Sequence, residues 1–301
     1  MKIVSLIPSA TEIVFALGLG DELEGVTFEC DFPDAARSKA IVSGTALPTD
    51  GSLSAREIDE AVSARVAEGE PIYTLDRGLI RAIQPDLILA QDLCRVCAVP
   101  SGAVSDALAM LGCDSQVLSL DPSTLDDVIE CVTLVGAATG TEDVAVTLTR
   151  GLRARTEMVR GAVATHHRPR VLALEWSDPP FSGGHWVPDM IEAAGGEPLL
   201  ARTGERSRRL DWEEVAAARP DVVVFMPCGY GLDEAVEEGC NLLDVPALAG
   251  AERIYATEAT ALFSRPGPRL VDGVEVLAWA IHPRAYPAPP TGTIEALRDR
   301  D

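Results

Sequence analysis

Two segments of the chain repeat one pattern, and this repeat constrains the fold more than any other feature. Residues 81–91 and 217–227 each contain the end of a helix, a Pro-Asp turn and a short apolar strand. A cysteine follows each strand, Cys94 in the first copy and Cys228 in the second. One copy lies in each half of the chain, so the repeat predicts two similar α/β lobes.

The apolar runs between these segments alternate with helical patterns, which is typical of doubly wound, parallel sheets. Open α/β sheets bind ligands at the carboxyl ends of their strands. We therefore expect two Rossmann-like lobes joined by a long connecting helix, with a ligand cleft between the lobes. The predicted parts are an N-terminal lobe at 1–121, a connecting helix at 122–167, a C-terminal lobe at 168–284 and a loose tail at 285–301.

The chain is strongly acidic, and its charge excludes several classes of partner. It carries 47 acidic residues against 25 basic ones, a net charge of −22, and Lys2 and Lys39 are its only lysines. Nucleic acid and anionic membranes would be repelled by this field. A lysine-poor acidic surface indicates adaptation to high salt, so we expect a halophilic source.

The same sequence favours a cytoplasmic location. The apolar start at residues 1–8 is too short for a signal peptide, and no run of about 18 apolar residues predicts a membrane span. An odd count of seven cysteines fits a reducing compartment better than a disulfide framework. A periplasmic or extracellular location would require a leader that this sequence does not contain.

Cysteines and one histidine follow several predicted strands and form a candidate metal site. Cys94 and Cys97 have the spacing of a redox pair, of half a metal site, or of two small residues packed in a loop. The other predicted members come from elsewhere in the chain, after a strand or in a glycine-rich loop. The candidate ligands for zinc or iron are Cys30, Cys94, Cys97, Cys228 and His185.

Aromatic side chains in predicted loops and strand ends suggest walls for a flat apolar ligand, although each could instead fill the interface between the lobes. Two arginines before the last helix are a candidate anion site, with surface ion pairing as the alternative. His166, His167 and His282 lie at helix ends, where we expect solvated side chains. The predicted ligand-binding set is Pro8, Ser9, Phe28, Phe32, Tyr73, Glu175, Trp176, His185, Trp186, Tyr230, Arg265 and Arg269.

These motifs resemble the substrate-binding proteins of ABC importers for vitamin B12 and ferric siderophores. Residues 3–12, residues 30–33 and the two Pro-Asp strands carry the resemblance over nearly the whole chain. It implies a corrinoid pocket lined by Phe28 or Phe32, and the stretch from Glu175 to Trp186 looks closer to a cytoplasmic branch described as cobalamin-binding.

The resemblance also implies docking on a permease through one glutamate in each lobe. The second-lobe position is Glu213, which matches, whereas the first-lobe position is Gly78, with Asp76 as the nearest acid. Half of the docking signature is therefore missing, so only the second lobe supports the expectation of a permease partner.

No catalytic motif emerges, so binding is a better expectation than catalysis. The sequence predicts a binding protein for a metal-containing small molecule, most simply a corrinoid such as cobalamin. One alternative is a cytosolic protein that holds zinc or iron directly through the cysteines and His185. Another is a cysteine-dependent enzyme acting on a cofactor precursor, with Cys94 or Cys228 as nucleophile.

Overall fold

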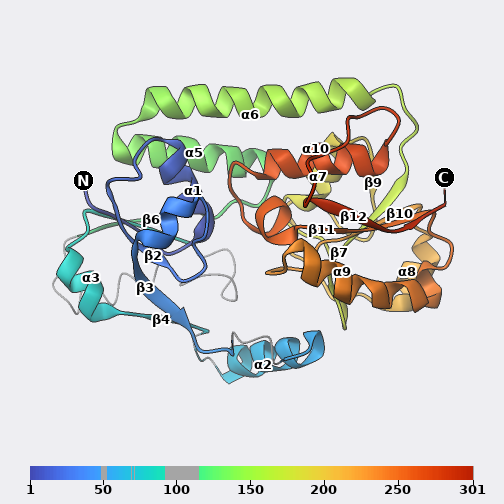
Figure 1. The fold of residues 1–301 in the computed structure, drawn as a ribbon, viewed down its shortest axis with the longest axis horizontal. Helices are drawn as coiled ribbons and strands as arrows, with labels where there is room; N and C mark the ends of the chain where they lie inside the picture. Colours follow the sequence, from blue (N-terminus) through green and yellow to red (C-terminus); the bar gives the residue numbers. More distant parts are fainter. Residues whose placement is uncertain (49–52, 69, 71, 92–114, 301) are drawn as a thin grey trace. The chain divides into compact units, whose positions relative to one another are not determined.

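The chain folds into two compact α/β units, each built on one sheet (Figure 1). This confirms the predicted fold class. Unit 1 consists of Met1–Asp121 with Glu130–Leu148, and unit 2 of Pro122–Ile129 with Thr149–Asp301. The computed structural model describes residues 1–48, 53–68, 70, 72–91 and 115–300.

The sheet of unit 1 has the strand order β4-β3-β2-β1-β5-β6, and only β4 runs antiparallel to its neighbour. Its strands are β1 (Ile3–Ser5), β2 (Leu23–Thr27), β3 (Ala40–Thr45), β4 (Tyr73–Leu75), β5 (Leu87–Ala90) and β6 (Gln116–Ser119). Between them lie α1 (Pro8–Ala16), η1 (Asp34–Ser38), α2 (Ala55–Glu68) and α3 (Arg77–Ile83).

Both faces of this sheet are buried, which explains why its central strands are continuously apolar. Along β5, Leu87 and Leu89 pack in one hydrophobic cluster with α1, whereas Ile88 packs in a second cluster on the opposite face. Successive side chains of a strand point to opposite faces, so a strand covered on both sides needs an apolar residue at every position. The second cluster includes Ile80 of α3.

The predicted single connecting helix is in fact two helices, α5 (Leu125–Thr139) and α6 (Glu142–Val163). The break falls at Gly140, whose φ of +69° is a left-handed conformation that glycine adopts without steric cost. In unit 1 the two helices lie side by side (Figure 1), and a Cβ built on Gly136 would lie 2.5 Å from the Cβ of Ala145. The sequence pattern predicted a single helix and did not show that the chain reverses at this glycine.

The sheet of unit 2 has the order β12-β11-β10-β7-β8, and β9 also pairs with β7. Its strands are β7 (Arg170–Ser177), β8 (Pro180–Ser182), β9 (Glu197–Pro198), β10 (Val222–Phe225), β11 (Arg253–Thr257) and β12 (Ile294–Asp299). The helices are α7 (Val187–Ala193), α8 (Trp212–Ala218), α9 (Leu232–Gly239) and α10 (Leu270–Ile281), with short turns η2 (Cys240–Asp244), η3 (Pro246–Leu248) and η4 (Thr260–Ser264).

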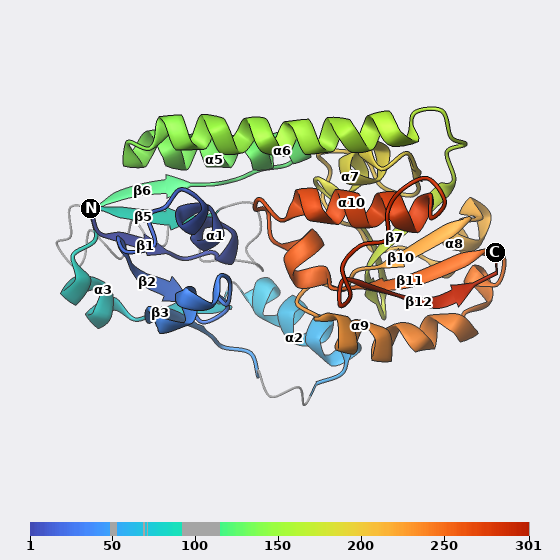
Figure 2. The ribbon, with the colours of Figure 1, turned by 45° about the horizontal axis from the view of Figure 1, so that its top comes forward.

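Strands β7, β10 and β11 are parallel and form the centre of this sheet. Figure 2 shows α10 on one face and α9 on the other. The run Val222–Phe225 is fully buried and rich in β-branched residues, which fit a strand packed on both faces. Phe225 faces α9, because a Cβ built on Gly239 of that helix would lie 3.1 Å from the Phe225 ring.

The expected loose tail contains a strand. Residues 294–299 form β12, which pairs antiparallel with β11 at the sheet edge. Arg298 fastens it by donating to the carbonyls of Leu248 and Leu243, at 2.7 and 3.1 Å. Its partners lie about fifty residues earlier in the chain, so the local proline-rich pattern gave no sign of them.

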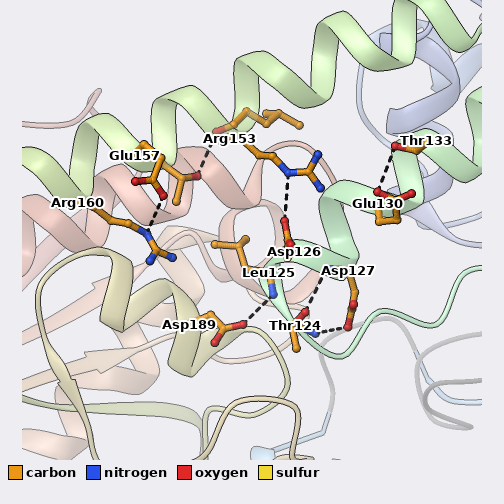
Figure 3. A network of polar contacts seen from close by, with 12 residues as sticks. Thr124, Leu125, Asp126, Asp127, Glu130, Thr133, Arg153, Glu157, Arg160 and Asp189 are labelled. Atoms are coloured by element: carbon orange, nitrogen blue, oxygen red, sulfur yellow. Dashed lines mark hydrogen bonds and ion pairs between the residues drawn. The ribbon is translucent and has the colours of Figure 1, made fainter.

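The first turn of α5 is anchored within unit 2. The Leu125 amide donates to Asp189 of α7 at 3.0 Å, and Asp126 pairs with Arg153 of α6 at 3.2 Å (Figure 3). Asp127 accepts from the amide of Thr124 at 2.9 Å, which caps the helix start. In the part of the chain that the structure describes, no helix is both long enough and apolar enough to cross a membrane.

Candidate functional site

An aromatic pair lies at the carboxyl edge of the unit 2 sheet. Trp176 is near the end of β7, and Tyr230 follows β10, whose residues Val222–Phe225 are in register with Val171–Leu174 of β7. The two rings lie 5.6 Å apart at 76°, an edge-to-face arrangement. Both side chains are half-buried, and Cys228 beside them is exposed. The structure thus brings together three residues that the sequence placed at this edge.

Hydrogen bonds to the turn η4 and to strand β7 hold the loop that carries Tyr230. Its carbonyl accepts from the amide and from the hydroxyl of Thr260, at 3.2 and 3.0 Å, and the Cys228 amide donates to the carbonyl of Glu175 at 3.3 Å. Burial raises the pKa of the Tyr230 hydroxyl, and the carboxylates of Glu238 and Glu234 raise it further. The phenol is therefore protonated at neutral pH and presents a hydrogen-bond donor.

Glu175 fixes a loop inside unit 2. Its carboxylate accepts from the Gly184 amide at 3.0 Å and from the Ser207 hydroxyl. Its two oxygens therefore tie the glycine-rich loop to the segment around residue 207. Sequence reasoning missed Ser207, because residues 199–210 follow neither a helical nor a strand period.

His185 and Trp186 lie behind the edge where we expected them. Strand β8 runs antiparallel to β7, so by Gly183 the chain has returned to the level of Ala173, whose carbonyl accepts from Gly183 at 3.0 Å. Trp186 is 6% exposed and donates from Nε1 to the Phe263 carbonyl at 2.8 Å. It therefore packs inside unit 2 instead of forming an open wall.

His185 has a left-handed backbone, with φ of 51°, and its ring lies 5.5 Å from that of Trp186. Its Nε2 is buried and has no hydrogen-bond partner among the described residues. Burial lowers the pKa of the imidazole, and the charge of Arg206 lowers it further. The ring is therefore neutral at pH 7.

The predicted anion site lies at the start of α10. Arg265 and Arg269 are both half-buried, and they flank the turn that leads into this helix. The Gly267 amide donates to the Arg265 carbonyl at 2.8 Å, and the Gly273 amide donates to the Arg269 carbonyl at 3.1 Å. These bonds fix the backbone of the two arginines, and binding of an anion there stays a prediction.

Unit 1 also places aromatic rings at the carboxyl edge of its sheet. Phe28 follows β2, and Tyr73 opens β4, which reaches the same edge because it runs antiparallel to β3. Their ring centroids lie 6.3 Å apart. Phe32 is 45% exposed, more than most aromatic side chains of a folded domain. Ser9, by contrast, is buried in the first turn of α1, and Pro8 before it is half-buried.

The described residues do not form the predicted metal site. Cys30 is 5% exposed, belongs to the hydrophobic cluster around α1, and its Sγ lies 3.0 Å from Oγ1 of Thr11. Among the residues with described positions, no group of three or more histidines, cysteines or carboxylates has metal-binding geometry. Cys94 and Cys97 lie outside the described residues. The local strand pattern misled the expectation for Cys30, because it showed the strand end but not the helix that covers it.

The predicted docking glutamate lies beside a hollow in unit 2. Glu213 is the second residue of α8, next to a cavity of about 640 Å³ that Trp212, Val245 and Pro246 also line. In unit 1, Gly78 lies in α3, and Asp76 caps that helix by accepting from the Leu79 amide at 2.9 Å. Asp76 therefore has a local structural role.

Comparison with known proteins supports the fold. A protein-family model described as periplasmic binding protein matches residues 3–252. An uncharacterized ABC transporter substrate-binding lipoprotein, YvrC of Bacillus subtilis, is 25% identical over 95% of this chain and 81% of its own length. The vitamin B12-binding protein of Vibrio cholerae is 24% identical over 91% of this chain and 86% of its own. A periplasmic heme binding protein from Pseudomonas aeruginosa superposes with a TM-score of 0.71 at 21% identity, covering 100% of this chain and 99% of that one.

Proposed function

The chain belongs to the periplasmic binding protein family, and we propose that it binds a corrinoid of the cobalamin type. The ligand would pack against the aromatic side chains at the carboxyl edge of the unit 2 sheet, where Trp176 and Tyr230 meet. The vitamin B12-binding relative from Vibrio cholerae supports this choice of ligand. The single observation that carries the proposal is the half-buried Trp176–Tyr230 pair, with its rings 5.6 Å apart.

The chemistry of the pair suits a large flat macrocycle. An indole and a phenol present apolar faces for the ring system, and the protonated Tyr230 hydroxyl can donate to a peripheral amide. The exposed Cys228 lies in the same loop, so its thiol is the candidate group for contact with the metal. Phe28, Tyr73 and Phe32 offer a similar apolar surface at the edge of the unit 1 sheet.

The charge of the chain favours a ligand without strong negative charge. At a net charge of −22, the net electrostatic field of the protein repels polyanions. A corrinoid carries amide side chains and little net charge, whereas heme carries carboxylates. Electrostatics therefore favours a corrinoid over heme as the ligand.

Titration of the purified protein with cyanocobalamin and with cobinamide tests the proposal, with binding followed by calorimetry and by tryptophan fluorescence. We expect Trp176→Ala to weaken binding by about 1.5–3 kcal/mol, roughly 10- to 150-fold, because it removes one large aromatic contact. Trp279→Ala is the matched control. Trp279 of α10 packs against Tyr255 of β11, away from the carboxyl edge, and its loss should leave affinity unchanged.

Several results would overturn the proposal. One is the absence of heat with either corrinoid, and another is tight binding of hemin without corrinoid binding. A third is stoichiometric zinc or iron in the purified protein that is lost in Cys94→Ser. Cytoplasmic location and permease docking through Glu213 stay predictions, which cell fractionation and cross-linking at residue 213 would test.

A further inference from the structure

A glutamate lies beside the aromatic pair at the carboxyl edge of the unit 2 sheet. Glu238 belongs to α9, and its Oε1 accepts a hydrogen bond from the Ser177 hydroxyl at 2.5 Å. Ser177 is the last residue of β7 and directly follows Trp176, whose ring meets that of Tyr230. The carboxylate of Glu238 therefore lies at the same edge as the Trp176–Tyr230 pair.

Neutral groups hold the Glu238 carboxylate in place. Its second oxygen accepts from the side-chain amide of Asn241 at 3.5 Å, and the Ser177 hydroxyl is likewise uncharged. In the part of the chain that the structure describes, no basic side chain forms an ion pair with Glu238. The residue is half-buried. Burying a charge without an opposite charge is unfavourable, so this carboxylate gains from a donor that a ligand supplies.

The charge of Glu238 acts on the aromatic pair itself. Burial raises the pKa of the Tyr230 hydroxyl most, and the charge of Glu238 raises it more than that of Glu234 does. The Glu234 carboxylate accepts from the Gly231 amide at 3.0 Å, at the start of α9. A charge that shifts the titration of the phenol is close enough to act on a ligand that contacts the ring.

We propose that Glu238 selects the ligand by its peripheral groups, accepting a hydrogen bond from a side-chain amide and repelling a side-chain carboxylate. Because Trp176 and Tyr230 form the proposed corrinoid site, this selection rests on the proposed function. A carboxylate has about four acceptor positions, and Ser177 and Asn241 use two of those on Glu238. A hydrogen bond from a ligand amide to this charged acceptor would be stronger than one between neutral groups.

The carboxylate makes a distinction that the rings cannot make. Trp176 and Tyr230 present apolar faces that suit any flat macrocycle, whatever groups it carries at its edge. A fixed negative charge next to these faces rejects a macrocycle whose edge is also negative, because like charges brought together are unfavourable. The net charge of the chain acts in the same direction, but salt screens it beyond about 8 Å.

Two corrin macrocycles with the same metal test the proposal. Dicyanocobinamide carries amide side chains, and dicyanocobyrinic acid carries carboxylates in their place. Titration followed by tryptophan fluorescence should show that the wild type binds the amide form at least tenfold more tightly. Glu238→Gln keeps an acceptor for Ser177 and should reduce this preference at least fivefold. Glu237→Gln is the matched control, because it removes the same charge from an exposed position of the same helix and should leave the preference unchanged.

A measurement without ligand tests where the charge acts. The protein has four tyrosines, and their ionisation is followed by ultraviolet absorbance as the pH rises. We expect the pKa of one tyrosine to fall in Glu238→Gln and to stay unchanged in Glu237→Gln. Ser177→Ala should weaken the preference for the amide macrocycle as well, because the carboxylate loses the hydroxyl that holds it.

The outcomes separate this proposal from the proposed function. Binding of both macrocycles with the same preference in the wild type, Glu238→Gln and Glu237→Gln would overturn the role of Glu238 and leave the corrinoid site standing. Equal affinity of the wild type for the two macrocycles, or tyrosine titrations that do not differ between Glu238→Gln and Glu237→Gln, would also overturn it. Binding of neither macrocycle would overturn the proposed function and the role of Glu238 together.

Discussion

Arg155 of α6 joins that helix to α10 within unit 2, and its removal should be costly. Its Nε and one terminal nitrogen donate to the two oxygens of Glu275, at 3.0 and 2.8 Å, and the terminal nitrogen also contacts Asp272 at 2.5 Å. The side chains are 35%, 30% and 43% exposed for Arg155, Glu275 and Asp272. These bonds raise the pKa of the guanidinium, against the smaller opposing effect of its own burial.

The expected magnitude follows from this geometry. A hydrogen bond to a charged group contributes about 1.5–3 kcal/mol when it is buried, and an exposed ion pair contributes about 0.2–1 kcal/mol. With three bonds that are each about one-third exposed, we place the network at roughly 2 kcal/mol after allowance for solvent screening. Arg155→Met also leaves Asp272 and Glu275 repelling each other at i, i+3, which adds about 0.2–0.5 kcal/mol.

Urea unfolding followed by circular dichroism measures the effect. Arg155→Met should lower the free energy of unfolding by about 2 kcal/mol, and a double-mutant cycle with Glu275→Gln should give a coupling near 1 kcal/mol. Arg160→Met is the control. Arg160 pairs with Glu157 at 3.5 Å on the exposed face of the same helix, so its loss should cost less than about 0.5 kcal/mol. Equal effects of the two variants, or no coupling, would refute the reasoning.

Three further predictions concern single positions in unit 2. Gly273→Ala should lower the melting temperature sharply, because the new Cβ would lie 2.2 Å from a main-chain carbonyl oxygen. Gly151→Ala on α6 is the control: its Cβ would meet nothing within 4 Å, and the change should stabilise the protein by up to about 1 kcal/mol. Burial lowers the pKa of His185 from its ordinary 6.5, so the unfolded state binds more protons than the folded state. The free energy of unfolding therefore falls as the pH drops below about 6.5. The difference between the unfolding free energies at pH 5 and pH 7 should be smaller in His185→Gln than in the wild type. Trp186→Phe should cost about 1–3 kcal/mol in the same urea assay, since a buried carbonyl loses its donor, and an unchanged midpoint would contradict this.

The helices and strands near the repeat could be predicted because their patterns are local. The run Val222–Phe225 is apolar at every position, and this local pattern is enough to predict a strand that is buried on both faces. The α3 helix, Arg77–Ile83, ends within the repeat, as the sequence predicted, and Asp76 caps its start. The sequence predicted one connecting helix, whereas the reversal at Gly140 depends on close packing between Gly136 and Ala145.

The candidate site could be predicted only in part, because exposure of a loop side chain depends on distant segments. Trp176 and Trp186 looked equivalent in the sequence, yet Trp186 bonds to a carbonyl 77 positions away and is buried. Arg298 of β12 likewise donates to the carbonyls of Leu248 and Leu243, which lie about fifty residues earlier in the chain. Such pairings leave no periodic trace in the chain.

The sequence by itself determined that this protein is an acidic α/β chain with two similar sheets and polar or aromatic residues where their strands end. Continuous apolar runs and the turn residues that bound them encode these features over a few neighbouring positions. Only the tertiary structure decided that Trp176 and Tyr230 meet at one edge, that Cys30 is covered, and that Ser177 holds Glu238 beside the aromatic pair. These groupings depend on contacts between residues that are far apart in the sequence. The local sequence around each side chain fixes only its own backbone conformation.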